Sequence, residues 1–276
     1  MVEEDEKKTN ASWNEECQQL FSLAGETVLI TGAFSGLGLY FANLFLKAGA
    51  RVAMAGRRLE QGRALAAQLQ EGVNPSGVPR VAAFRLDVTS RESAEQCLLE
   101  ADVHLGSPTI LINNAGITET SRFLETGEVD WNGVINTNLN GVWRLSQCFA
   151  ARRQMQKAPG VIVNVASILG IRVAQQLAAY SVSKAAVLQL TKAMALELAR
   201  YGIRVNALAP GYFVTDLNRE FMASESGMAL INRIPLRRLG ELEELAGPML
   251  LLASRASSFM TGSVLVADGG HSSNSL

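Results

Sequence analysis

The chain of 276 residues lacks the features that would place it in a membrane, at a membrane surface or on nucleic acid. No apolar run reaches the ~18–20 residues that a membrane-spanning helix needs. Residues 1–8 are mostly charged, whereas a secretory signal starts basic and then becomes apolar. The 25 lysines and arginines nearly balance the 26 aspartates and glutamates, so net charge favours neither nucleic acid nor an anionic membrane. We therefore expect a cytoplasmic protein.

Cysteine and histidine are scarce. The three cysteines, Cys17, Cys97 and Cys148, are odd in number and far apart, which gives neither a disulfide framework nor a zinc site. The two histidines, His104 and His271, match no metal-binding or catalytic-triad spacing. We therefore predict reduced thiols, no metal site, and histidines that are incidental to function.

Apolar, β-branched runs alternate with helical patterns along most of the chain. The runs predict strands over 27–31, 51–55, 81–86, 109–113, 161–165, 204–208 and 263–266. The patterns between them predict helices over 37–48, 59–70, 91–105, 131–156, 178–201 and 241–252. Such alternation is typical of a parallel sheet covered on both faces. We expect an α/β fold with a doubly wound, seven-stranded parallel sheet (Rossmann) as a single domain over residues 25–276, after an N-terminal extension of residues 1–24.

A glycine-rich turn, Thr31–Gly38, joins the first predicted strand to the first predicted helix. Glycines here permit a tight turn and let the backbone approach a pyrophosphate, which would lie at the helix N-terminus. The spacing G-x-x-x-G-x-G alone is a weak signal, but its place after the first strand favours a dinucleotide site. The predicted cofactor contacts in the turn are Gly32, Phe34, Ser35, Gly36, Leu37 and Gly38.

The end of the second predicted strand bears on the type of dinucleotide. An acidic residue there would bond the ribose 2′-hydroxyl of NAD, but this chain has Gly56 followed by Arg57 and Arg58. Guanidinium groups pair with phosphate in a forked geometry, whereas a carboxylate would repel it. We therefore predict that Arg57 and Arg58 contact the 2′-phosphate of NADP; the alternative is that both are solvated surface charges.

Tyr180 and Lys184 are four residues apart on a predicted helix, so they share one face. An ammonium beside a phenol favours the phenolate, and we expect it to lower the pKa of Tyr180 from its ordinary value of about 10. A phenol that titrates nearer neutrality is a usable general acid or base. With the glycine turn, the pair indicates proton transfer coupled to hydride transfer.

Six segments occur together in one order: Thr31–Gly38, Asn113–Gly116, Asn138, Ser167, Tyr180–Lys184 and Pro210–Gly211. In this order the chain resembles the short-chain dehydrogenases/reductases over residues 25–270. Within that family it is similar in particular to 3-oxoacyl-ACP reductases and gluconate 5-dehydrogenases. The resemblance implies that Tyr180 is the acid/base and that Lys184 also binds the nicotinamide ribose. It implies that Ser167 bonds the substrate oxygen and that Asn138 holds a water in a proton relay.

The resemblance implies further cofactor contacts and an assembly. Asp87 would contact the adenine amino group, with Val88 beside it, and the Asn114, Ala115 and Gly116 run would line the adenine ribose. Pro210, Gly211, Val214 and Thr215 would lie beside the nicotinamide, and residues 215–235 would form a substrate loop. The family is usually tetrameric through two long helices, on which Trp143, Leu145 and Phe149 could contact a partner.

The sequence thus predicts an enzyme that transfers a hydride between NADP(H) and a carbonyl or secondary alcohol. The sequence does not decide which substrate class is used: a 3-oxoacyl thioester, a sugar acid, or a cyclic or aromatic ketone. The alternative from another class is a dinucleotide-binding scaffold or sensor without turnover. The presence of Asn138, Ser167, Tyr180 and Lys184 together argues against that alternative.

Overall fold

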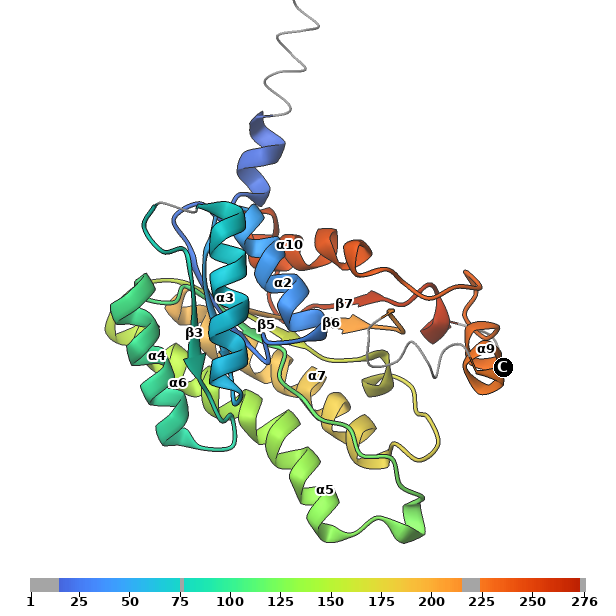
Figure 1. Cartoon of the computed structure of the whole chain (residues 1–276). Helices are drawn as coiled ribbons and strands as arrows, with labels where there is room; N and C mark the ends of the chain where they lie inside the picture. The colour runs from blue at the N-terminus through green and yellow to red at the C-terminus, as the bar shows by residue number, and fades with distance from the viewer. Residues whose placement is uncertain (1–14, 75–76, 215–223, 274–276) are drawn as a thin grey trace, which may run out of the picture.

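The fold is built on a parallel sheet of seven strands in the order β3-β2-β1-β4-β5-β6-β7 (Figure 1). It is seen in a computed structural model that describes residues 15–74, 77–214 and 224–273. The strands are β1 (Thr27–Thr31), β2 (Arg51–Gly56), β3 (Val81–Arg85), β4 (Ile110–Asn113), β5 (Gly160–Val165), β6 (Ile203–Pro210) and β7 (Val264–Ala267). The predicted seven-stranded fold is confirmed. The strand order reverses between β1 and β4, and ligands of open α/β sheets bind at the carboxyl ends of strands near such a reversal.

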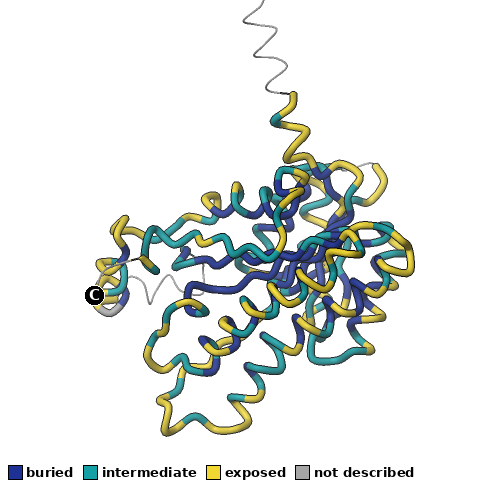
Figure 2. The backbone as a smooth tube through the Cα atoms, turned by 180° about the vertical axis from the view of Figure 1, so that it is seen from behind, coloured by how far each residue is buried: buried dark blue, intermediate teal, exposed yellow. Residues whose placement is uncertain are grey.

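Helices cover both faces of the sheet. One face carries α2 (Gly36–Lys47), α3 (Leu59–Val73) and α10 (Ala246–Ala253); the other carries α4 (Arg91–Leu105), α6 (Gly141–Met155) and α7 (Ala178–Leu198). Two shorter helices are α5 (Glu128–Ile135) and α9 (Glu225–Ile231), and residues 15–21 are also helical. Side chains alternate along β1, so that Val28 and Ile30 join the first layer and Leu29 joins the second. Figure 2 accordingly shows the buried residues concentrated along the strands.

The long helix predicted over 131–156 is present over 128–155, but its winding is not uniform. A π-helical turn, η2 (Asn136–Asn140), separates α5 from α6. The turn holds Asn138, which is fully buried and bonds the backbone of Ile117 through both side-chain atoms. Such turns insert one residue into a helix and occur frequently at functional sites.

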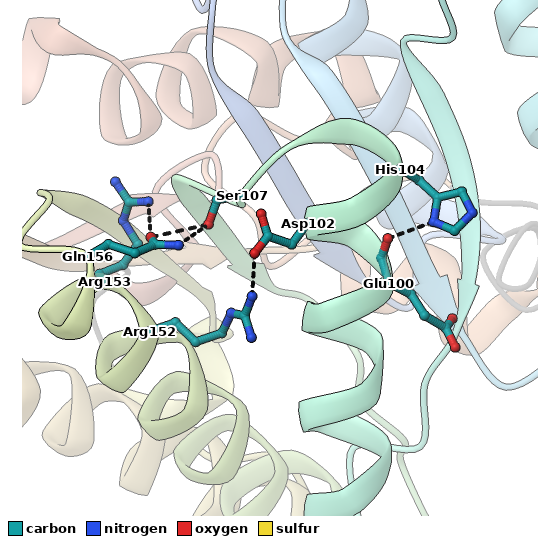
Figure 3. A network of polar contacts seen from close by, with 7 residues as sticks. All are labelled: Glu100, Asp102, His104, Ser107, Arg152, Arg153 and Gln156. Carbon is teal, nitrogen blue, oxygen red and sulfur yellow. Dashed lines mark hydrogen bonds and ion pairs between the residues drawn. The ribbon is translucent and has the colours of Figure 1, made fainter.

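A polar network ties α4 to α6 at the amino ends of the strands (Figure 3). Asp102 on α4 pairs with Arg152 on α6, and Gln156 bonds both Ser107 and Arg153. His104, drawn in the same view, is not joined to these residues: its Nδ1 lies 2.8 Å from the backbone carbonyl of Glu100 on its own helix. Among the residues with described coordinates, no helix is long and apolar enough to cross a membrane.

Candidate active site

The glycine turn lies between β1 and α2 and packs closely against its surroundings. Gly32 and Gly36 have φ angles of 64° and 51°, in the left-handed region that favours glycine. A Cβ on Gly38 would lie 2.2 Å from the carbonyl oxygen of Gly32. Ser35, the N-cap of α2, is exposed and its side chain makes no capping bond. The turn therefore leaves the first N–H groups of α2 free to hold a phosphate.

Asn114 fixes this turn from the neighbouring strand. Its side-chain amide donates to the carbonyls of Thr31 and Gly32 over 2.9 and 3.2 Å. In return the Thr31 hydroxyl accepts the N–H groups of Asn114 and Ala115 at 2.9 and 2.8 Å. Asn114 was expected to line the ribose, and no role was expected for the Thr31 hydroxyl. The contact between them could have been inferred from a threonine at the end of one central strand and an asparagine just after the end of the neighbouring strand.

The adenosine end of the expected cofactor would lie where β2 and β3 end together. Arg57 and Arg58 are exposed there, directly after Gly56. Hydrogen bonds from Thr89 lower the pKa of the Asp87 carboxyl, and the guanidinium of Arg57 acts in the same direction. The structure therefore brings Asp87 and Arg57 near each other, as a site at this edge requires.

Val88, the neighbour of Asp87, packs against the start of α6, where a Cβ on Gly141 would lie 2.9 Å from its side chain. Its carbonyl accepts a bond of 2.6 Å from Arg144. This contact fixes the loop after β3 to the layer of α4, α6 and α7.

Ser167, Tyr180 and Lys184 meet at the carboxyl ends of the central strands. Ser167 follows β5 and accepts the N–H of Leu169 at 3.1 Å, and its side chain lies close enough to the phenol of Tyr180 to lower the pKa of that group. Lys184 donates to the carbonyl of Val165 at 2.8 Å, and its Nζ lies 5.6 Å from the Tyr180 ring centroid. The two hydroxyls and the ammonium thus face the same end of β5.

The expected lowering of the Tyr180 pKa by Lys184 is not what the structure gives. Burial raises the pKa of Tyr180, the side chain of Ser167 opposes this, and Tyr212 raises it further. Burial also lowers the pKa of Lys184 to about 8. Burial destabilises the charged form of both groups, and the spacing of two residues along a helix does not report how deeply they are buried. Tyr180 is therefore a protonated phenol at neutral pH, ready to act as an acid.

Asn138 is linked to the same helix. Its Nδ2 donates to the hydroxyl of Ser183 at 3.1 Å, and that hydroxyl donates to the carbonyl of Tyr180 at 2.7 Å. A Cβ on Gly116 would lie 3.3 Å from Asn138 Oδ1 and 3.7 Å from Lys184 Nζ, so all three residues border one small space. Ser183 is a link that the sequence analysis missed. The water relay through Asn138 stays a prediction.

The ends of β6 and β7 complete the edge. A Cβ on Gly211, which follows Pro210, would lie 2.7 Å from the Cα of Asp268. The N–H of Val214 donates to the Gly240 carbonyl at 3.0 Å. Residues 215–223 of the predicted substrate loop, Thr215 among them, lie outside the described residues, and residues 225–231 of it form α9.

Tyr212 and His271 were missed as site neighbours, and His271 had been taken as incidental. Their ring centroids lie 5.5 Å apart, and Tyr212 lies near enough to Tyr180 to raise the pKa of that phenol. Among the residues that the structure describes, none is a hydrogen-bond partner of the buried Nδ1 of His271, and Arg172 donates to the His271 carbonyl at 3.2 Å. Within the described part of the chain, no group of three acidic, histidine or cysteine side chains could hold a metal ion.

Comparisons with known proteins agree over nearly the whole chain. A family profile described as enoyl-(acyl carrier protein) reductase matches residues 32–272. A gluconate 5-dehydrogenase from Gluconobacter oxydans is 37% identical over 252 residues, covering 91% of this chain and 96% of that protein. A 3-oxoacyl-(acyl-carrier-protein) reductase from Thermotoga maritima is 37% identical over 249 residues, covering 90% and 98%.

Solved structures of dehydrogenases resemble this chain over a similar extent. A short-chain type dehydrogenase/reductase from Mycobacterium marinum has a TM-score of 0.85 and 39% identity, covering 92% of this chain and 98% of that one. A gluconate 5-dehydrogenase from Burkholderia cenocepacia, crystallised with NADP and tartrate, has a TM-score of 0.87 and 34% identity, covering 94% and 100%.

Proposed function

Because the chain belongs to the short-chain dehydrogenase/reductase family, we propose that it transfers a hydride between NADP(H) and a carbonyl or secondary alcohol. One observation carries this proposal. Ser167 lies close enough to the phenol of Tyr180 to lower its pKa, with Lys184 one turn along the helix, at the sheet edge that also holds the glycine turn. That arrangement can move a proton at the oxygen of a substrate while its carbon exchanges a hydride.

Each polar group has a distinct part. When bound, the nicotinamide cofactor accepts or supplies the hydride. In the reducing direction the protonated Tyr180 donates its proton to the substrate oxygen, and in the oxidising direction the phenolate takes that proton back. Ser167 donates a hydrogen bond to the same oxygen and stabilises its developing charge. Lys184, a buried cation whose Nζ lies 5.6 Å from the Tyr180 ring centroid, offsets only part of the cost that burial adds to forming the phenolate.

The residues present fit NADP. The turn offers close backbone approach at Gly36 and uncommitted N–H groups at the start of α2. No carboxylate ends β2, and the exposed Arg57 and Arg58 follow it instead. The Burkholderia relative was crystallised with NADP, which supports the same choice.

For the substrate we favour a sugar acid or its keto form. Two of the relatives are named for gluconate. Polar and basic groups also gather beside Tyr212, because Arg172 and Arg233 both act electrostatically on His271. A 3-oxoacyl thioester is the second candidate, since the Thermotoga relative acts in that class by its name.

A substrate panel tests the proposal. The purified protein is mixed with keto sugar acids, 3-oxoacyl thioesters and cyclic ketones, and NADPH and NADH consumption is followed in parallel at the nicotinamide absorbance. We expect NADPH-dependent turnover of a keto sugar acid, abolished by Tyr180→Phe without loss of NADPH binding. Absence of turnover across the panel would instead favour the non-catalytic scaffold.

We also propose a homotetramer located in the cytoplasm. Trp143 on α6 is 44% exposed and borders a concavity of about 390 Å³ between α6 and α7, which a second copy could fill. Leu145 and Phe149, also expected at an interface, are instead core residues. The free cysteines support a reducing compartment. Light scattering would test the assembly, and a monomeric mass would contradict it.

A further inference from the structure

The side chain of Phe34 points out of the glycine turn into the layer between β2 and α3. It is 4% exposed, and two glycines lie against its ring. A Cβ on Gly56, at the end of β2, would lie 2.7 Å from Phe34 Cε2. A Cβ on Gly62, in α3, would lie 2.3 Å from Phe34 Cε1. One ring therefore requires both positions to be without a side chain.

Gly62 has no other evident reason to be a glycine. It lies inside a helix, where glycine is unfavourable relative to alanine. Its φ angle is not in the left-handed region, and the three atoms nearest to its Cβ position all belong to the Phe34 ring. The space taken by the ring explains why the sequence has glycine here.

The ring cannot easily move aside. The carbonyl of Phe34 accepts a bond of 3.2 Å from Gln61, and the N–H of Ala33 donates to Ala55 at 3.3 Å. The ring also belongs to the core cluster with Ala66. Because interiors are close-packed, a new carbon within 3 Å of the ring forces a shift of the turn or of β2.

We propose that Phe34 is a specificity-determining residue for the cofactor, because it excludes any side chain at position 56. This rests on the proposed NADP-dependent function. The last residue of the second strand is where a carboxylate would bond the ribose 2′-hydroxyl of NAD. With that position emptied by the ring, the exposed Arg57 and the uncommitted hydroxyl of Ser35 are left to face the 2′-phosphate.

The steric part of the proposal is tested on the protein without cofactor. Gly56→Ala and Gly62→Ala each lower the Tm by several degrees in the Phe34 background. In a Phe34→Leu background, which removes the ring atoms nearest the glycines, each costs much less. Gly72→Ala is the matched control, because it lies on the same helix and a Cβ there meets nothing within 4 Å; it leaves the Tm unchanged or raised in both backgrounds.

The cofactor part is tested by binding. NADPH and NADH dissociation constants are measured by nicotinamide fluorescence for Phe34→Leu, Gly56→Asp and the double variant. We expect Gly56→Asp alone to weaken both cofactors, because the turn is displaced. The double variant shifts the preference toward NADH by about tenfold or more relative to Phe34→Leu.

The outcomes distinguish the steric effect of the Phe34 ring from its effect on cofactor preference. If Gly56→Ala and Gly62→Ala lower the Tm equally in both backgrounds, the ring is not the cause and the proposal falls. If the Tm effects couple but Gly56→Asp alone already switches preference to NADH, the ring does not set specificity and the proposal also falls. Neither result depends on turnover. A substrate panel without turnover would therefore contradict the proposed function but would leave the Tm comparison of the glycine variants unaffected.

Discussion

Replacing Lys184 with methionine should change how stability depends on pH. Lys184 is 5% exposed and its one described hydrogen bond goes to the Val165 carbonyl. Burial lowers the pKa of Lys184 from 10.5 to about 8. Between these two values the unfolded chain binds more protons than the folded chain, so raising the pH stabilises the folded protein.

The magnitude follows from the two pKa values. A fall from 10.5 to about 8 corresponds to roughly 3 kcal/mol in the free energy of unfolding, at about 1.4 kcal/mol per pH unit. Below about pH 8 the folded protein carries the full cost of the buried ammonium, and the cost disappears as the pH rises through the unfolded value. Between about pH 7 and pH 10 the wild type should therefore gain most of this, about 2 to 3 kcal/mol, relative to Lys184→Met.

Urea denaturation at several pH values measures this difference directly. Lys192→Met is the matched control, because Lys192 is exposed on the same helix; its difference from the wild type should stay flat. The comparison is repeated in a Tyr180→Phe background, since a phenolate at that position would hold the proton on Lys184. A stability difference between Lys184→Met and wild type that does not change with pH would refute the reasoning.

Three other outcomes are expected. Because burial raises the pKa of Tyr180, kcat/KM for carbonyl reduction should fall, and that for alcohol oxidation should rise, only on the alkaline side of neutrality; identical profiles in both directions would contradict this. Ser167→Ala should lower kcat by about a hundredfold, since one donor to the developing oxyanion is lost, while NADPH binding measured by fluorescence is retained. Gly38→Ala should weaken NADPH binding and lower the Tm, because its Cβ would lie 2.2 Å from the Gly32 carbonyl; Gly133→Ala, where a Cβ meets nothing, is the control, and equal effects would argue against a close-packed turn.

Local patterns were enough to predict the sheet. Runs such as 161–165 are short, apolar and β-branched, and they alternate with longer amphipathic stretches, so strand number and direction follow from the pattern. The grouping of Ser167 with Tyr180 also followed, because a strand end and the next helix start meet at one edge of a parallel sheet.

Features that depend on depth and three-dimensional contact were not predictable. The π-helical turn exists because the amide of Asn138 bonds Ile117, which is distant in sequence and invisible to helical periodicity. The direction in which the pKa of Tyr180 shifts depends on how deeply the phenol is buried, and the spacing of residues along the sequence does not report that depth. The relation of Phe34 to Gly62 joins a turn to the face of a helix, and single-residue propensity only marks that glycine as unfavourable.

The turn at Asn136–Asn140 also limits which changes of length the chain can tolerate. Each residue of an α-helix advances the chain by about 100° around the axis. Deleting one residue within the turn would restore regular winding between Glu128 and Met155 with little rotation of α5 against α6, but it would shift the side chains of the turn itself by up to about that angle. The same deletion would carry the amide away from Ile117, so point substitutions here should be accepted far more readily than single-residue gaps.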